Sequence, residues 1–118
     1  MRVLHVSQPT SEGVAVVVCR LVAAQVERGW SVIVACPPNG WLANRAQELG
    51  AMVLAWPSVR HPLHGVASEV RSLNRLLRDI RPDLVHLHSA KAGLSGRLAI
   101  RGRLVTIYQP HAWSFHAA

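Results

Sequence analysis

The order of short apolar runs and amphipathic stretches along the chain is the feature that most restricts its fold. Five runs rich in Val, Leu, Ile and Ala are predicted strands, at residues 2–6, 31–36, 52–56, 84–88 and 104–109. They show little alternation of polar and apolar residues, which is typical of parallel strands covered on both faces. Segments with helical spacing separate them, at residues 14–28, 41–49, 66–80 and 92–101. This alternation predicts an α/β domain built from βα units around a parallel sheet.

The ends of the predicted helices are marked by glycine and proline. Gly29 and Gly50 follow the first two helices, where a left-handed cap favours glycine. Pro82 ends the third helix, because its ring and missing N–H cannot continue the helical hydrogen bonds. Apolar residues of this third helix recur at steps of three and four, whereas its arginines lie off that stripe: Val66, Val70, Leu73, Leu77 and Ile80 against Arg71, Arg75 and Arg78.

The predicted topology brings several loops to one edge of the sheet. Right-handed crossovers carry the first three strands to one side and the last two to the other, giving the Rossmann-like order 3-2-1-4-5 with helices on both faces. The fifth strand is then an exposed edge. Ligands of such sheets bind outside the carboxyl ends of the strands, at the point where the winding reverses. The loops after residues 6, 88 and 109 should therefore line one crevice.

Composition says more about the class of this protein than about the partner that it binds. The 118 residues fit a single domain, and the formal net charge of +7 comes almost entirely from arginine, since Lys91 is the only lysine. This charge suits an anionic partner such as a phosphate, a nucleic acid or an acidic membrane, or equally a solvated arginine-rich face. Cys19 and Cys36 are not a close CxxC pair, so we expect two buried thiols in a reducing cytosol. The longest apolar stretch, residues 14–24, is too short to cross a bilayer, which takes about 20 residues.

Two helix starts at the predicted crevice could hold an anion. Gly13 opens the first helix, where unpaired N–H groups and the helix dipole favour a phosphate, although it could equally be a simple turn residue. Neither GxGxxG nor a P-loop is present. Ser89 and Lys91 open the fourth helix and could bind a phosphate or hydroxyl, or Ser89 could be an ordinary N-cap. Arg60, His61 and His64, with Arg71 and Arg75, form a basic zone that is either solvated or docks on anionic lipid.

Three histidines in or after the last two strands are candidates for a site. His86 and His88 point to the same face of one strand, a spacing that could ligate a metal. A metal site needs a third or fourth ligand, and only His111 is a plausible addition, so we expect no metal, with His86 in the core and His88 at the crevice. His111 follows Pro110 at the end of the fifth strand, where its ring could donate to a ligand hydroxyl or phosphate, or could cap the sheet.

The segments PDLVHLHSAKAGLSGRLA and PHAWSF, with RVLHVS and RGWSVIVACP before them, resemble the N-terminal domain of the family 4 retaining glycosyltransferases. The likeness is closest to bacterial members that build exopolysaccharide or other envelope glycans. The resemblance implies the two-domain GT-B architecture, in which the N-terminal domain binds the acceptor and a C-terminal domain holds the nucleotide-sugar. It implies that Gly13 contacts the donor, that His111 acts near the reacting centre, and that His88, Ser89 and Lys91 line the acceptor side. One departure is that Glu12 precedes Gly13, where the family often has paired glycines.

From this resemblance we expect residues 1–118 to be one acceptor-side domain without its donor domain, inactive alone. The co-substrates would be a nucleotide-sugar and a glycan or lipid-linked acceptor, with no cofactor or metal. The protein would be cytoplasmic, on the inner face of the plasma membrane. A different class of function is a non-catalytic basic module that docks on an anionic membrane or a partner protein. Nucleic acid is not an expected partner, because the chain carries no recognised nucleic-acid motif or aromatic stacking platform.

Overall fold

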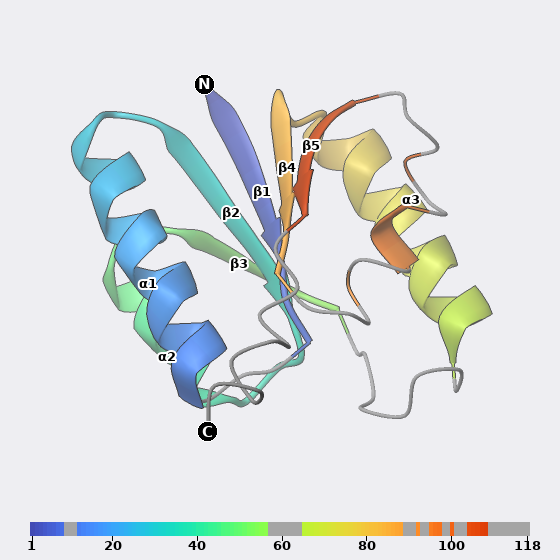
Figure 1. The fold of residues 1–118 in the computed structure, drawn as a ribbon, viewed down its shortest axis with the longest axis horizontal. Coiled ribbons are helices and arrows are strands. Elements are labelled where there is room, and N and C mark those ends of the chain that lie inside the picture. The colour runs from blue at the N-terminus through green and yellow to red at the C-terminus, as the bar shows by residue number, and fades with distance from the viewer. Residues whose placement is uncertain are drawn as a thin grey trace.

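A parallel sheet forms the centre of the molecule (Figure 1). The computed structural model describes residues 1–8, 12–56, 65–88, 92, 95–97, 100 and 104–108, with Glu12 described by its backbone alone. Within these ranges five strands pair in parallel in the order β3-β2-β1-β4-β5, which confirms the predicted order. Their bounds are β1 (Arg2–Val6), β2 (Ser31–Cys36), β3 (Met52–Ala55), β4 (Leu84–Leu87) and β5 (Val105–Tyr108).

β3 and β4 each end one residue earlier than predicted, and β5 begins one residue later. Further hydrogen bonds nevertheless extend β3 and β4. The N–H of Trp56, just past β3, donates to the carbonyl of Cys36 over 2.9 Å, and that of His88, just past β4, donates to Val6 over 3.0 Å. Strand ends differ by such amounts because pairing weakens gradually there. β5 is an edge of the described sheet, as predicted, and Val105 and Ile107 on it are 69% and 46% exposed.

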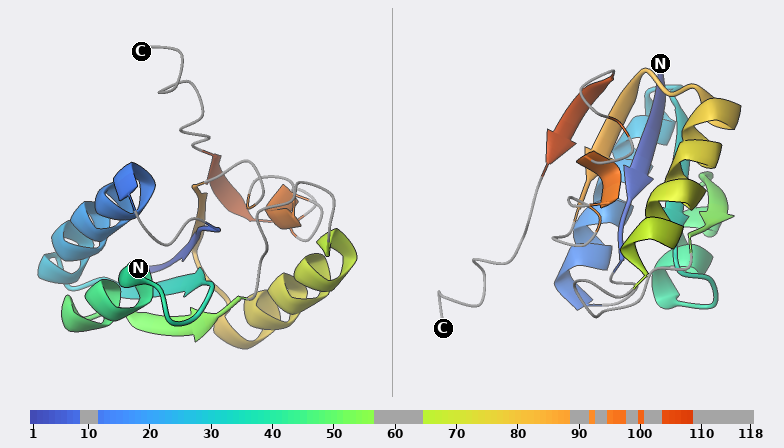
Figure 2. Two further views of the ribbon diagram at one scale, coloured as in Figure 1. Left: turned by 90° about the horizontal axis from the view of Figure 1, so that it is seen from below. Right: turned by 90° about the vertical axis from the view of Figure 1, so that its right-hand side faces the viewer.

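Helices cover both faces of the sheet (Figures 1 and 2). α1 (Glu12–Glu27) and α2 (Trp41–Glu48) lie on one face, and α3 (Val66–Ile80) lies on the other. Residues 92, 95–97 and 100, from the predicted fourth helix, are helical and lie on the α3 side. α1 begins two residues earlier than predicted, so that Gly13 belongs to its first turn. Gly29 and Gly50 have φ values of 84° and 105°, which confirms the predicted left-handed positions after α1 and α2.

Alternate residues of the inner strands separate two hydrophobic cores. Val3 and Val34 face α1 and α2, whereas Leu4 and Val85 face α3. Trp56 is fully buried in the second core, where its indole N–H donates to the carbonyl of Glu69 over 3.2 Å. The arginines of α3 are exposed, as its sequence pattern predicted. Both cysteines are buried.

Gly96 lies against the side chain of Leu87 on β4. A Cβ atom placed on Gly96 would lie 2.5 Å from Cδ2 and 2.9 Å from Cδ1 of Leu87, whose side chain is fully buried. The backbone of this segment can therefore pack directly on Leu87 only because position 96 lacks a side chain. This contact fixes the helix that follows residues 89–91, one of the loops predicted to line the crevice.

We expect Gly96→Ala to destabilise the fold, because the added methyl group has no space against Leu87. The free energy of unfolding should fall by about 1 to 3 kcal/mol, the usual cost of overpacking. Urea unfolding followed by circular dichroism would measure it. Gly13→Ala is the matched control, since a Cβ there would meet no atom within 4 Å. A Gly96→Ala protein as stable as the control would show that this contact does not restrict the packing.

Candidate functional site

Three histidines lie together beneath the carboxyl edge of the sheet, at the point where the winding reverses. His5 on β1 is directly opposite His86 on β4 in the parallel register. His88 lies two residues beyond His86 and therefore on the same face of the sheet, the face that α1 covers. The side chains of all three are buried, with exposed fractions of 0%, 7% and 0% in chain order.

Hydrogen bonds connect this histidine cluster (His5, His86 and His88) to α1. Nε2 of His5 lies 2.7 Å from Oε1 of Gln25, and Nδ1 of His5 lies 2.8 Å from Nε2 of His88. An amide oxygen can only accept, so the proton of His5 is assigned to Nε2, and Nδ1 accepts from the Nε2–H of His88. The rings of His86 and His88 stack with their centroids 3.8 Å apart. The cluster thus joins α1, β1 and the end of β4.

Burial keeps His5 neutral. Loss of hydration lowers the pKa of His5 from 6.5 to about 4; the hydrogen bond to Gln25 raises it and the nearby His86 lowers it further. A charged imidazole here would lack the water that stabilises it. The histidine cluster is therefore a buried polar group beneath the carboxyl edge of the sheet, and His5 does not exchange a proton near neutral pH.

The structure gives a position to two of the five predicted site residues. Gly13 is exposed in the first turn of α1, with open space where a side chain would be. His88 is enclosed by protein rather than open to the crevice, and its role toward an acceptor stays a prediction. Ser89, Lys91 and His111 lie outside the described residues, as do Arg60, His61 and His64 of the predicted basic zone.

Sequence reasoning missed His5 and Gln25 as members of this cluster. The predicted strand order already placed the strand of His5 beside that of His86, and both are interior strand residues, so strand parity could have paired them. No pattern in the sequence indicated that Gln25 contacts His5, because this contact depends on how α1 is rotated against the sheet.

A cation–π contact joins the helical residues after β4 to β5. The guanidinium carbon of Arg97 lies 4.3 Å from the centroid of the Tyr108 ring. Arg97 belongs to the segment PDLVHLHSAKAGLSGRLA, and Tyr108 is the last described residue before PHAWSF. The contact therefore holds part of the first segment against the strand that precedes the second.

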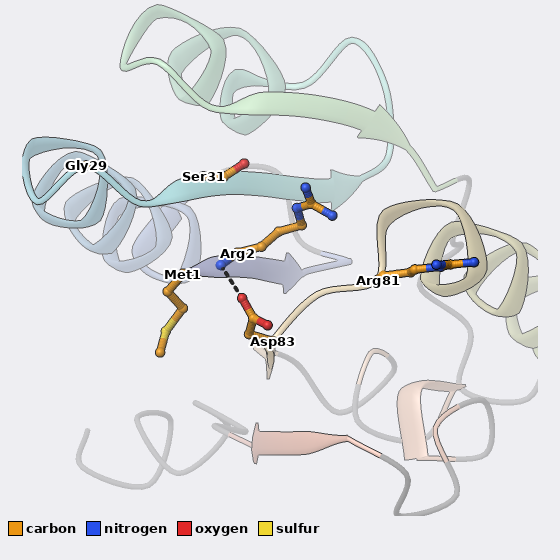
Figure 3. Close-up of a pocket in the computed structure, with 6 residues that line it drawn as sticks. All are labelled: Met1, Arg2, Gly29, Ser31, Arg81 and Asp83. Atoms are coloured by element: carbon orange, nitrogen blue, oxygen red, sulfur yellow. Dashed lines mark hydrogen bonds between the residues drawn. The ribbon is translucent and has the colours of Figure 1, made fainter.

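A cavity of about 430 Å³ lies at the opposite, amino-terminal edge of the sheet (Figure 3). It is formed by strand starts and helix ends: Met1, Arg2, Gly29, Ser31, Arg81 and Asp83. The backbone N–H of Arg2 donates to Oδ2 of Asp83 over 2.7 Å, and its guanidinium donates to the carbonyl of Ile80 at the end of α3. These charges stabilise a helix end and a strand start. The carboxyl edge is the candidate site, because ligands of such sheets bind there.

Comparison with known families fits this architecture. The family model described as the glycosyl transferase 4-like domain matches residues 12–118. The chain belongs to this family. A search of curated proteins found none that matches this chain. Within its described residues, no helix combines the length and apolar character that a membrane span requires.

Solved structures similar to this glycosyl transferase 4-like domain share its fold. Alr3699/HepE of Anabaena, in complex with UDP and glucose, aligns over 92% of the chain and 29% of its own, with 19% identity and a TM-score of 0.68. A glycosyltransferase from Rickettsia africae ESF-5 aligns over 98% of this chain and 32% of its own, with 13% identity and a TM-score of 0.70. A deacetylase from teicoplanin biosynthesis, in complex with teicoplanin, aligns over 97% of this chain and 72% of its own, with 10% identity and a TM-score of 0.65.

The glycosyl transferase 4-like domain thus spans about 30% of the length of the first two of these structures. Its fold is that of one Rossmann-like half of the GT-B architecture. The deacetylase shows that a similar fold also occurs with another activity, so the fold alone does not decide the chemistry.

Acid should destabilise the fold through His5. Because its pKa is lower in the folded chain (about 4) than in the unfolded one (6.5), the unfolded chain binds the proton more readily between these values. Stability should be complete above pH 6.5 and decrease as pH falls toward 4, by on the order of 3 kcal/mol from this residue.

Urea unfolding at several pH values, with a chelator present, would measure this dependence. His5→Gln is the comparison, since glutamine does not titrate, and its stability should change less across the same window. Equal pH dependence in both proteins would contradict the assignment to His5.

Proposed function

We propose that this domain is the acceptor-binding half of a retaining glycosyltransferase that moves a sugar from a nucleotide-sugar to a cell-envelope or exopolysaccharide glycan. The observation that carries the proposal is the family match across residues 12–118. The complex of Alr3699/HepE with UDP and glucose supports a uridine nucleotide-sugar as donor. Under this proposal the donor-binding half belongs to a longer protein, and residues 1–118 alone transfer no sugar.

The geometry of the carboxyl edge suits this reaction. Departure of a nucleoside diphosphate develops negative charge, which the N-terminus of α1 can stabilise through its N–H groups and dipole. Gly13 leaves open space there for the close approach of a phosphate or sugar. No metal ion is needed for this step, since fixed positive groups and helix N-termini can provide the charge.

The remaining roles follow the chain order of the loops at this edge. His111, after β5, would donate a hydrogen bond to the donor sugar near the reacting carbon. Ser89 and Lys91, after β4, would contact the acceptor, and His88 would hold their loop from below. The buried histidine cluster supports this arrangement, because a rigid base preserves the positions of the loops above it.

We expect His111→Ala, in a protein that carries both halves, to lower kcat by about a hundredfold or more with a smaller change in acceptor KM, as for loss of a group acting in the transition state. UDP release and labelled-sugar transfer would measure it. His64→Ala is the control for loss of an imidazole elsewhere. Unchanged turnover of His111→Ala would remove the proposed role, and sugar transfer by residues 1–118 alone would contradict the division into halves.

A second candidate function is docking on an anionic surface without catalysis. Its support is the charge of +7 and the exposure of Arg71, Arg75 and Arg78 on α3. Such an arginine face attracts acidic lipid headgroups and would bring the domain to the inner face of the plasma membrane, near a lipid-linked acceptor.

Co-sedimentation with vesicles tests this candidate. We expect binding to acidic vesicles that is lost in neutral vesicles and at high salt. Replacing the three α3 arginines by glutamine should weaken it, whereas Arg20→Gln, an exposed arginine on α1, should not. Equal sedimentation with acidic and neutral lipid would contradict membrane docking.

A further inference from the structure

The histidine cluster has the composition of a metal site. One ring nitrogen from each of His5, His86 and His88 can be chosen so that the three atoms lie within 4.8 Å of one another. Tetrahedral zinc with bonds of about 2.0 to 2.1 Å requires ligand nitrogens roughly 3.3 Å apart. The 2.8 Å separation between His5 and His88 would widen and the longest separation would shorten, changes within the reach of side-chain torsions.

The ligand atoms select a class of ion. The cluster offers imidazole nitrogens and no carboxylate, and calcium and magnesium prefer oxygen. Imidazole suits zinc, copper, nickel and iron. Three protein ligands with a fourth position for water or another small oxygen ligand are a common arrangement for zinc.

Gln25 orients the ring that connects the two strands. Histidines that bind a metal usually donate their other ring N–H to an oxygen, which fixes the lone pair on the ligating nitrogen. His5 has this arrangement, because its Nε2–H donates to Gln25 and its Nδ1 faces His88. On binding, the Nε2 proton of His88 would have to move to its Nδ1, which leaves the ring neutral. For His5 and His88, one tautomer change would therefore free both facing nitrogens to bind a metal.

We propose that His5, His86 and His88 bind one divalent transition-metal ion, zinc in the first instance, with Gln25 as the residue that positions His5. The sequence alone argued against a metal because the HxH pair needed a further ligand, and His5 supplies it from the neighbouring strand. The ion would join β1 to β4 at the winding reversal, below the crevice. This inference is independent of the proposed sugar transfer.

The test uses residues 1–118 without a polyhistidine tag, freed of metal by a chelator. Titration with ZnCl₂ at neutral pH by calorimetry, and with CoCl₂ by its visible absorption, should show one ion per chain and a cobalt spectrum typical of a four-coordinate site. Zinc should also raise Tm by several degrees, because it binds the folded chain preferentially. His5→Gln, His86→Gln and His88→Gln should each lower the zinc affinity at least tenfold, and His64→Gln should leave it unchanged.

Gln25→Leu is the variant that separates a metal site from a purely structural network. It leaves all three ligands in place, and we expect a loss of affinity of about tenfold, as for other residues that orient a metal-bound histidine. Far-UV circular dichroism tests whether each variant is folded. If the histidine variants do not fold, the zinc stoichiometry of the unmodified chain and the change in zinc affinity of Gln25→Leu decide whether the site exists. No stoichiometric zinc binding to the unmodified chain, or equal affinity in folded cluster variants, would overturn the proposal.

Discussion

The parallel pairing of β1 with β4 is the contact on which the rest of this structure depends. Val3, Leu4, His5 and Val6 pair in register with residues 84–87, although 81 positions separate each pair in the sequence. At this pair the winding reverses, so that α1 and α2 cover one face and α3 the other. The same pair brings the loops after β1 and β4 to one edge and sets His5 beside His86. A parallel pair needs a crossover, and the chain from α1 to α3 provides it here.

The histidine cluster is the unusual part of this sheet. Buried polar rings are costly unless their hydrogen bonds are satisfied, and His5 is held between His88 and Gln25 of α1. These bonds are directional, whereas the surrounding aliphatic contacts are not. The bond between His5 and Gln25 therefore adds a directional contact to the many apolar contacts that set the rotation of α1 on the sheet. The same directionality is what makes the cluster a candidate for a metal ion.

The proposed site lies at the carboxyl edge of a sheet whose strand order was predicted from the sequence. That prediction was possible because glycine and proline mark helix ends and apolar runs mark strands. The strands that end at Leu87 and Tyr108 were predicted to be neighbours, and their parallel pairing confirms it. The burial of His88 could not be predicted from the sequence, because the alternation along a strand gives the face on which a side chain lies but not what covers that face.

The sequence by itself determined the α/β class, the strand order and the residues that begin and end most elements. These depend on local periodicity, on turn chemistry and on the handedness of crossovers, all of which are short-range properties of the chain. Only the tertiary structure decided that Gln25 contacts His5, that Leu87 requires glycine at position 96, and that three histidines from two strands share one buried space. These depend on the rotation and depth of packed helices, which are set by many distant side chains acting together and leave no local pattern in the sequence.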